Sequence, residues 1–139
     1  MNKNICFFTL VALLFSNSVL AIPYDAEYSE CLKKTATDAG ITQCTEKEIA
    51  LVKQEIQKLS ENLAVINQNY KPSDAQSIQN LSQQTAIYND FYCSLYTHAR
   101  HNDGYSDAYH SANCRLIKYL QLYRDLESLY SIALTDIKG

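Results

Sequence analysis

The sequence predicts an all-α fold, an up-and-down helical bundle of about four helices stapled by two disulfides. Apolar residues recur at alternating steps of three and four over three long segments, which is the spacing of one helix face. The few prolines and glycines fall between helical segments rather than inside them. Four cysteines follow an N-terminal export signal, and small exported domains commonly pair such cysteines as disulfides.

Residues 1–21 have the organisation of a signal peptide: a positive start, an apolar run of about 11 residues, and the short side chain of Ala21 before the expected cut. A membrane anchor would need about 20 apolar residues, so this run is too short. Cys6 lies far from the cut, which argues against a lipoprotein. We therefore expect export, to the periplasm or the medium, of a single helical domain that spans residues 22–139.

The first two helices are predicted from their ends and from one apolar face. The first is expected over residues 25–37. The second is expected to begin at Thr45, because Thr45 and Glu48 have the spacing of a capping box. Gly40 would then mark the boundary between the two helices. The apolar face of the second helix comprises Ile49, Val52, Ile56, Leu59, Leu63, Ile66 and Tyr70.

The third helix is expected to follow Pro72, where Ser73 and Gln76 have capping-box spacing, and the fourth to follow Gly104. These breaks divide the chain into units of roughly 30 residues, which favours a bundle over a continuous coiled coil. The apolar face of the third helix comprises Ile78, Leu81, Thr85, Tyr88, Tyr92, Leu95 and Ala99. The face of the fourth comprises Leu116, Tyr119 or Leu120, Tyr123, Leu126, Tyr130, Ala133 and Ile137.

Cys31, Cys44, Cys93 and Cys114 allow three disulfide connectivities. A predicted turn lies midway between Cys31 and Cys44, and another lies midway between Cys93 and Cys114. Residues equidistant from the turn of a helical hairpin face each other, so these two pairs are favoured. A crossed pair such as Cys44–Cys93 stays open, because the second and third helices are also antiparallel neighbours. No pair has the spacing of a structural zinc knuckle.

Composition excludes several classes of function. The formal net charge is −3, and loss of Lys3 with the signal makes it −4. Nucleic acid is therefore not an expected partner, since phosphate binding needs clustered basic residues. The only long apolar run lies in the signal, so no membrane anchor is expected. We find no cofactor fingerprint, no nucleophile elbow and no placeable pair of carboxylates, so we expect neither a cofactor nor an enzyme.

The chain has 11 Tyr and no Trp. One interpretation places these rings in the core and at its margin, with hydroxyls toward solvent. The other is an aromatic binding face, because Tyr is enriched at protein interfaces. On the second interpretation, the residues around the last turn form the candidate partner-binding site: Tyr96, His101, Asp103, Tyr105, Tyr109 and His110.

The same turn collects all three histidines. His98 and His101 are three residues apart, as are Asp107 and His110. A closed hairpin would bring these four side chains together, and imidazole and carboxylate groups are ligands of zinc and copper. The alternative is a polar, solvated turn that carries ordinary histidines.

The four cysteines also form a recognisable frame, in which twelve residues separate the first pair and a long amphipathic helix precedes the second. Residues 89–93 read Asn-Asp-Phe-Tyr-Cys, and residues 104–106 read Gly-Tyr-Ser. Over residues 25–130 the chain thus resembles the LprI-type lysozyme inhibitor domain, a family of small exported bacterial helical proteins once catalogued as a domain of unknown function. The family motifs are Arg-Asp-x-x-Cys, after a Gln-rich helix containing Trp, and Gly-Gly-Ser. Asp90 and Cys93 match, whereas Asn89 departs and the Trp is missing.

This resemblance implies an exported, non-catalytic binding protein that inhibits a host or environmental lysozyme. The protein partner would be a basic lysozyme, toward which an acidic bundle is steered. Two alternatives stay open from the residues themselves. One is a carrier of a small apolar ligand, if the Tyr-lined bundle encloses a cavity. The other is a metal-binding protein built on the histidine cluster. The sequence does not indicate an oligomeric state.

Overall fold

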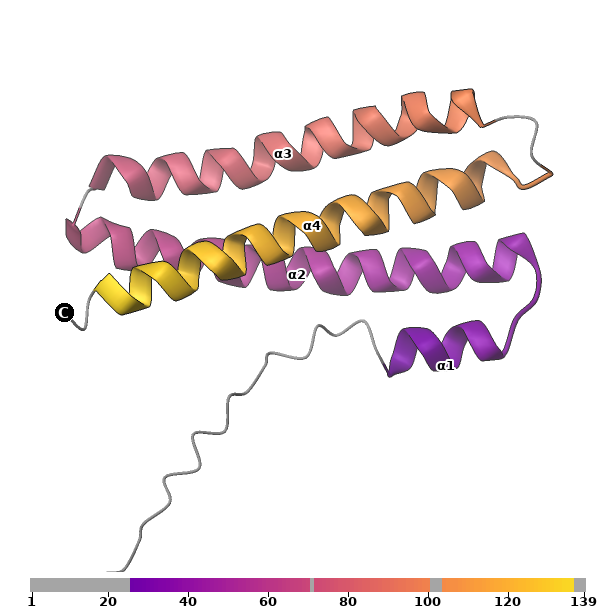
Figure 1. Ribbon diagram of the computed structural model, residues 1–139, viewed down its shortest axis with the longest axis horizontal. Helices are drawn as coiled ribbons and strands as arrows, with labels where there is room; N and C mark the ends of the chain where they lie inside the picture. The colour runs from indigo at the N-terminus through magenta and orange to yellow at the C-terminus, as the bar shows by residue number, and fades with distance from the viewer. Residues whose placement is uncertain (1–25, 71, 101–103, 137–139) are drawn as a thin grey trace, which may run out of the picture.

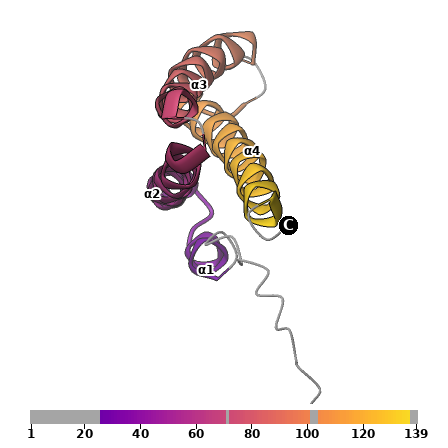
Figure 2. The same cartoon turned by 90° about the vertical axis from the view of Figure 1, so that its left-hand side faces the viewer.

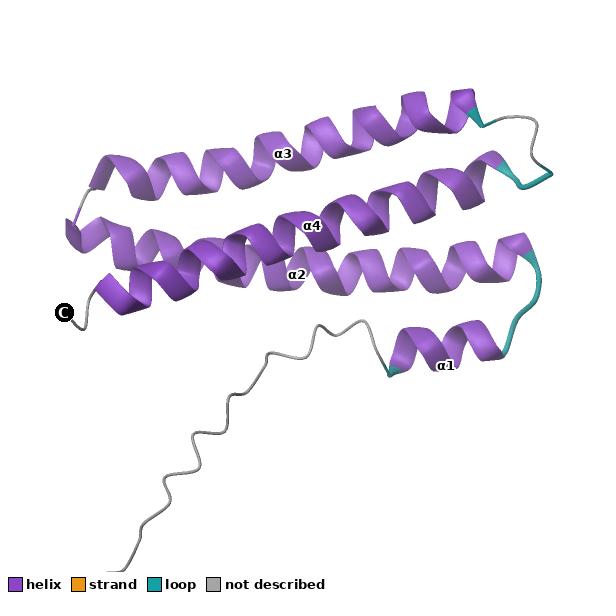
Figure 3. Ribbon diagram, in the orientation of Figure 1, coloured by secondary structure: helices purple, strands orange, loops and turns teal. Residues whose placement is uncertain are grey.

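The computed structural model describes residues 26–70, 72–100 and 104–136, apart from the side chains at 69–70 and 72–74. This part of the chain forms four helices and no strand, which confirms the predicted all-α class. Each long helix runs antiparallel to the next, and the short first helix lies along the second (Figures 1 and 2). Figure 3 distinguishes the helices from the described loop residues, which join α1 to α2 and lead into α4. The helices are α1 (Glu27–Lys33), α2 (Asp38–Tyr70), α3 (Pro72–Ala99) and α4 (Asp107–Asp136).

The main core lies between α2 and α4. Ten of its eleven members were predicted for the apolar faces of the second and fourth helices, and each is at most 7% exposed: Ile49, Val52, Ile56, Leu59 and Leu63 from α2, with Leu116, Tyr119, Leu120, Tyr123 and Leu126 from α4. The eleventh, Leu122, was not predicted, and the predicted Ile66 is only partly buried. Full burial of one such side chain contributes about 1.5–3 kcal/mol. Tyr130 and Ala133 pack against this cluster at its edge. The side chains of Tyr70 and Ile137, also predicted for these faces, lie outside the described residues.

The connection between α1 and α2 differs from the prediction. The first helix was expected over residues 25–37, but α1 ends at Lys33 and α2 already begins at Asp38. Thr37 caps the start of α2, because its Oγ1 accepts a hydrogen bond from the backbone N–H of Gly40 at 3.1 Å. The α2 helix is therefore longer than its apolar pattern indicated.

The predicted capping box of Thr45 and Glu48 is wrong, because both residues lie inside α2. The Thr45 hydroxyl donates instead to the backbone carbonyl of Ile41 at 2.9 Å. It also lies 3.0 Å from the hydroxyl of Tyr28, which links α1 to α2. Both Thr45 and Glu48 are buried, and Thr45 belongs to the α1–α2 contact through Tyr28.

Gly40 lies in the first turn of α2 rather than between two helices. A Cβ atom at this position would lie 1.8 Å from Oγ1 of Thr35 and 2.7 Å from its Cβ. Such contacts are not possible without moving the loop, so glycine is required here by the close approach of Thr35.

The α3 face predicted to be buried is mostly exposed, so that prediction is wrong. Leu81, Tyr88, Tyr92 and Leu95 are between 39% and 59% exposed. Ile78 alone among the large apolar members of that face packs against the core cluster. The buried residues of α3 are instead Asn89, Cys93 and Thr97, which recur every four residues.

Polar and covalent links fix this rotation of α3. The Cys93 sulfur is bonded to Cys114 of α4. The side-chain amide of Asn89 donates to the backbone carbonyl of Lys118 at 3.5 Å. The Ser82 hydroxyl lies 2.7 Å from that of Ser60 on α2. These links all need the same side of α3 to face the bundle, so the larger apolar residues opposite them face outward.

The structure has the two favoured disulfides, and the crossed pairing is excluded. Cys31–Cys44 joins α1 to α2 with a Cα–Cα distance of 5.8 Å, and Cys93–Cys114 joins α3 to α4 with a distance of 5.5 Å. No described helix combines the length and the apolar character needed to cross a membrane. The expected signal, residues 1–21, lies outside the described part of the chain.

Candidate binding site

Residues 104–106, which lead into α4, are held against the start of α2. The backbone N–H of Ser106 donates to Oδ2 of Asp38 at 2.9 Å. The Ser106 hydroxyl accepts a hydrogen bond from the backbone N–H of Tyr109 at 3.2 Å and so caps α4. Gly104 has a φ of 91°, a left-handed conformation that glycine adopts without strain. The chain therefore enters α4 in a defined geometry, at the same end of the bundle as the α1–α2 connection (Figure 1).

Three aromatic side chains gather at this end, and we call Tyr105, Tyr109 and His110 the aromatic cluster. The rings of Tyr105 and Tyr109 stack with centroids 4.7 Å apart and an interplanar angle of 18°. The His110 ring meets them edge-on, at 5.9 Å from Tyr105 and 5.5 Å from Tyr109. His110 is 7% exposed and Tyr105 is 52% exposed. The cluster is thus anchored in the bundle on one side and open to solvent on the other.

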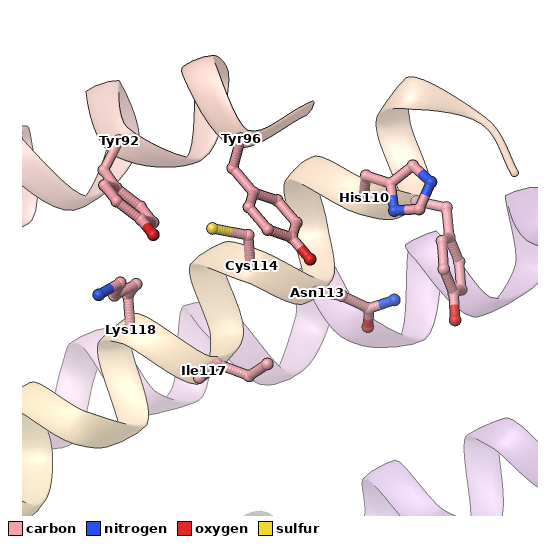
Figure 4. A pocket seen from close by; sticks show the side chains of 8 residues that line it. Tyr92, Tyr96, His110, Asn113, Cys114, Ile117 and Lys118 are labelled. Atoms are coloured by element: carbon pink, nitrogen blue, oxygen red, sulfur yellow. The ribbon is translucent and has the colours of Figure 1, made fainter. Parts of the chain in front are cut away.

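An open groove between α3 and α4 continues from the aromatic cluster. Its volume is about 350 Å³, at the lower end of the range of small-ligand pockets. Figure 4 shows the rings of Tyr92 and Tyr96 projecting from α3 toward α4. The lining residues are Tyr92 and Tyr96 from α3, with Tyr109, His110, Asn113, Cys114, Ile117 and Lys118 from α4.

Two cations flank the aromatic wall of the groove. The ammonium of Lys118 lies 4.5 Å from the centre of the Tyr92 ring. The guanidinium of Arg100 lies 5.4 Å from the centre of the Tyr96 ring. Cations at these distances are attracted to the electron-rich face of the ring. The groove therefore combines apolar surface with positive charge, although the chain as a whole is acidic.

The structure brings together four of the six residues predicted for partner binding. Tyr105, Tyr109 and His110 form the aromatic cluster, and Tyr96 lines the groove beside two of them. The other two, His101 and Asp103, lie outside the described residues. The disulfide Cys93–Cys114 lies at the base of this region, since Cys114 lines the groove and Cys93 is fully buried.

The predicted metal ligands are dispersed where they are described. His98 is exposed, and its Nδ1 lies 3.1 Å from the backbone carbonyl oxygen of Ser94. Asp107 is exposed in the first turn of α4, and His110 packs in the aromatic cluster. Within residues 26–70, 72–100 and 104–136, no three His, Cys, Asp or Glu side chains are grouped to hold a metal ion. His101, the fourth predicted ligand, lies outside these ranges, so metal binding stays a prediction.

A second groove, of about 620 Å³, lies between α2 and α3 and reaches Tyr119 of α4. The Tyr119 hydroxyl donates to Oδ1 of Asp90 at 3.0 Å, and the ammonium of Lys53 lies 4.5 Å from the centre of the Tyr119 ring. Burial, followed by the hydrogen bond and negative charge of Asp90, raises the pKa of Tyr119 well above its usual value. The contacts of Tyr119 with Asp90 and Lys53 join all three long helices at this groove, which indicates a structural role.

Sequence reasoning missed the groove residues Tyr92, Asn113, Ile117 and Lys118 as a group. Tyr92 was assigned to a buried face, and the three α4 residues were assigned to no site. The signal that identifies them is the disulfide. Tyr92 adjoins Cys93, and the α4 residues lie one to four positions from Cys114, so pairing the cysteines places them side by side.

No protein-family model matches the chain, and no curated protein or solved structure matches it either. The geometry of the aromatic cluster and of the adjoining groove is therefore the basis for assigning a function.

Proposed function

We propose that this chain is an exported, non-catalytic binding protein that engages a protein partner through the aromatic cluster. The observation that carries the proposal is the arrangement of Tyr105 and Tyr109, stacked at 4.7 Å with Tyr105 half-exposed at a fixed turn. Tyr is among the residues that contribute most to binding energy at protein interfaces. Two stacked rings present a large contact area with few rotatable bonds.

Rigidity of the turn supports this use. The bond between Cys93 and Cys114, the Ser106 cap and the hydrogen bond to Asp38 hold the turn before any partner arrives. Binding then costs less conformational entropy than it would for a free loop. Protease inhibitors are pre-organised in this way, and their interface backbone moves little on binding.

The partner is expected to be basic. The formal charge of the full chain is −3, and opposite charge accelerates association between proteins. The resemblance to LprI-type domains makes a basic lysozyme the concrete candidate. Two disulfides in so small a chain suit an oxidising compartment, which supports export.

Direct binding to a panel of basic lysozymes tests this proposal. The oxidised protein should bind at least one member and slow its turnover. Tyr105→Ala should weaken that binding at least about 10-fold, because hot-spot tyrosines commonly contribute more than 1 kcal/mol. Leu129→Ala is the matched control, since Leu129 is 46% exposed on a distant part of α4 and its truncation should leave binding unchanged.

No binding to any lysozyme at about 100 μM, a range that would still detect weak complexes, rejects lysozyme as the partner. Equal effects of the Tyr105 and Leu129 substitutions on a complex that does form would reject the aromatic cluster as the binding site.

The groove between α3 and α4 favours a second candidate function, as a carrier of a small apolar ligand. Its volume of about 350 Å³ and its wall of Tyr92, Tyr96 and Ile117 suit a flat or branched apolar molecule. Native mass spectrometry of gently purified protein separates the two functions. A bound small molecule that is lost on Tyr96→Ala supports the carrier, whereas a bare chain mass counts against it.

A further inference from the structure

Half of the twelve exposed large apolar side chains in the described part of the chain lie on the outer side of α3. Six large apolar side chains lie there, each between 39% and 65% exposed. Isolated exposed apolar residues are normal, but a contiguous row along one helix indicates an interaction surface. We call this row the outer α3 face, and it comprises Leu81, Ile87, Tyr88, Phe91, Tyr92 and Leu95.

The outer α3 face has no charged member, although the ammonium of Lys118 from α4 lies against Tyr92 at its edge. From Ala75 to Ala99 the only charged side chain besides histidine is that of Asp90, which is exposed and whose carboxylate accepts a hydrogen bond from Tyr119 of α4. Depletion of charged residues is characteristic of the centre of protein interfaces. For an acidic chain it has a further consequence, because two copies can meet on this face without placing carboxylates against each other.

The spacing of the residues on the outer α3 face suits pairing with the same face of a second copy. Leu81 and Leu95 each lie seven residues from Tyr88, on the same side of the helix. If two α3 helices cross antiparallel with the two-fold axis at Tyr88, then Leu81 of one copy faces Leu95 of the other at both ends of the contact. A two-fold interface requires this kind of self-complementary arrangement.

The available area is sufficient for such a pair. Six large side chains, each about half exposed, offer roughly 600 Å² per copy, since a buried aromatic side chain covers about 150–250 Å². Two copies would bury roughly 1,200 Å², which is the lower bound for specific interfaces. Figure 2 shows α3 at the side of the bundle opposite α1, where a second copy has access to it.

From these observations we propose that the protein forms a two-fold homodimer through the outer α3 face, with antiparallel α3 helices crossing at Tyr88. This inference goes beyond the proposed binding function. Its central residues, Leu81, Tyr88, Phe91 and Leu95, belong neither to the aromatic cluster nor to the groove. Each copy would therefore present its own aromatic cluster, and a partner with two sites would be bound with avidity.

Sedimentation velocity of the purified, oxidised protein tests the dimer. We expect a concentration-dependent shift from monomer to dimer between about 1 and 100 μM, as suits an interface of this size. Phe91→Asp should raise the dissociation constant at least about 100-fold, because a two-fold interface contains the substitution twice. Ile132→Asp is the matched control, since Ile132 is 55% exposed on α4 and should leave the dimer intact.

Cysteine cross-linking tests the position of the axis. In an oxidising glutathione buffer, Tyr88→Cys should form a covalent dimer through residue 88 of both copies. Leu81→Cys and Leu95→Cys should each stay monomeric on a denaturing gel alone and cross-link when mixed. Circular dichroism of each variant checks that helicity is retained, and only variants that keep it are used to place the axis.

A monomeric wild-type protein at about 500 μM overturns the proposal, because a homodimer of this area would be populated there. A dimer whose dissociation constant is unchanged by Phe91→Asp also overturns the proposal. So does a cross-link pattern centred on a residue of α3 other than Tyr88. Lysozyme binding by a purely monomeric chain would reject the dimer and leave the proposed function standing, so the two proposals fail separately.

Discussion

Replacing both Cys93 and Cys114 by alanine should destabilise the domain by about 5 kcal/mol. The bond spans 21 residues, so its restriction of the unfolded chain is worth about 3.3 kcal/mol on the chain-entropy account. Cys93 is fully buried and Cys114 is 8% exposed, and each lost sulfur adds about 1 kcal/mol of lost burial. Domains of this size have a total stability of about 5–15 kcal/mol, so the variant would be marginal.

Urea unfolding of the oxidised protein and of this variant measures the effect. The midpoint should fall, and the dependence of unfolding free energy on urea should steepen, because an unfolded chain without the cross-link exposes more surface. The pair Cys31→Ala and Cys44→Ala is the comparison, with a 13-residue separation worth about 2.9 kcal/mol. Unchanged midpoints in the Cys93 and Cys114 variant would refute the reasoning that the bond stabilises this fold.

Three further predictions concern packing and protonation. Leu126→Ala should lower the unfolding free energy by about 3 kcal/mol in urea titrations, because Leu126 is 1% exposed in the core. Gly40→Ala should lower the thermal midpoint, because the new Cβ would lie 1.8 Å from Oγ1 of Thr35. Stability measured by urea should decline above about pH 10, where tyrosine ionises in the unfolded chain, because burial keeps Tyr119 protonated in the fold. Tyr119→Phe should make that decline smaller.

Each of these predictions has a control. Leu129→Ala, at a position 46% exposed, should change stability by less than about 0.5 kcal/mol. Adding Thr35→Gly to Gly40→Ala should restore the midpoint, and a failure to do so would locate the strain elsewhere. For Tyr119, the stabilising protonated state is fully present below the unfolded pKa and is lost as pH rises toward the folded pKa. Tyr123 has a raised pKa as well, so part of the decline should persist, and an unchanged slope would contradict the assignment.

The sequence predicts the core well where inward side chains are large. On α2 and α4, residues such as Val52 and Leu126 are both apolar and buried, so hydrophobic periodicity identifies the right face. Hairpin symmetry likewise identified both disulfides, because each pair lies about equally far from its turn.

Prediction failed where burial did not follow side-chain size. On α3 the inward residues Asn89, Cys93 and Thr97 are small or polar, whereas Phe91 and Leu95 face outward. A pattern based on apolar size therefore selected the outer side, which is also why the outer α3 face went unrecognised. The groove could not be predicted either, since Tyr92 reaches Lys118 only for one rotation of α3 about its axis.

Both disulfides lie toward the end of the bundle where the α1–α2 and α3–α4 connections meet (Figure 1). In the described residues neither disulfide lies at the opposite end, where Val65 is 62% exposed. Backbone amides near Val65 should therefore exchange hydrogen with solvent through local unfolding. Amides near Cys44 should exchange only when the whole domain unfolds. One end of the bundle would then open locally while the other stays closed, and the end that stays closed is the one that carries Tyr105.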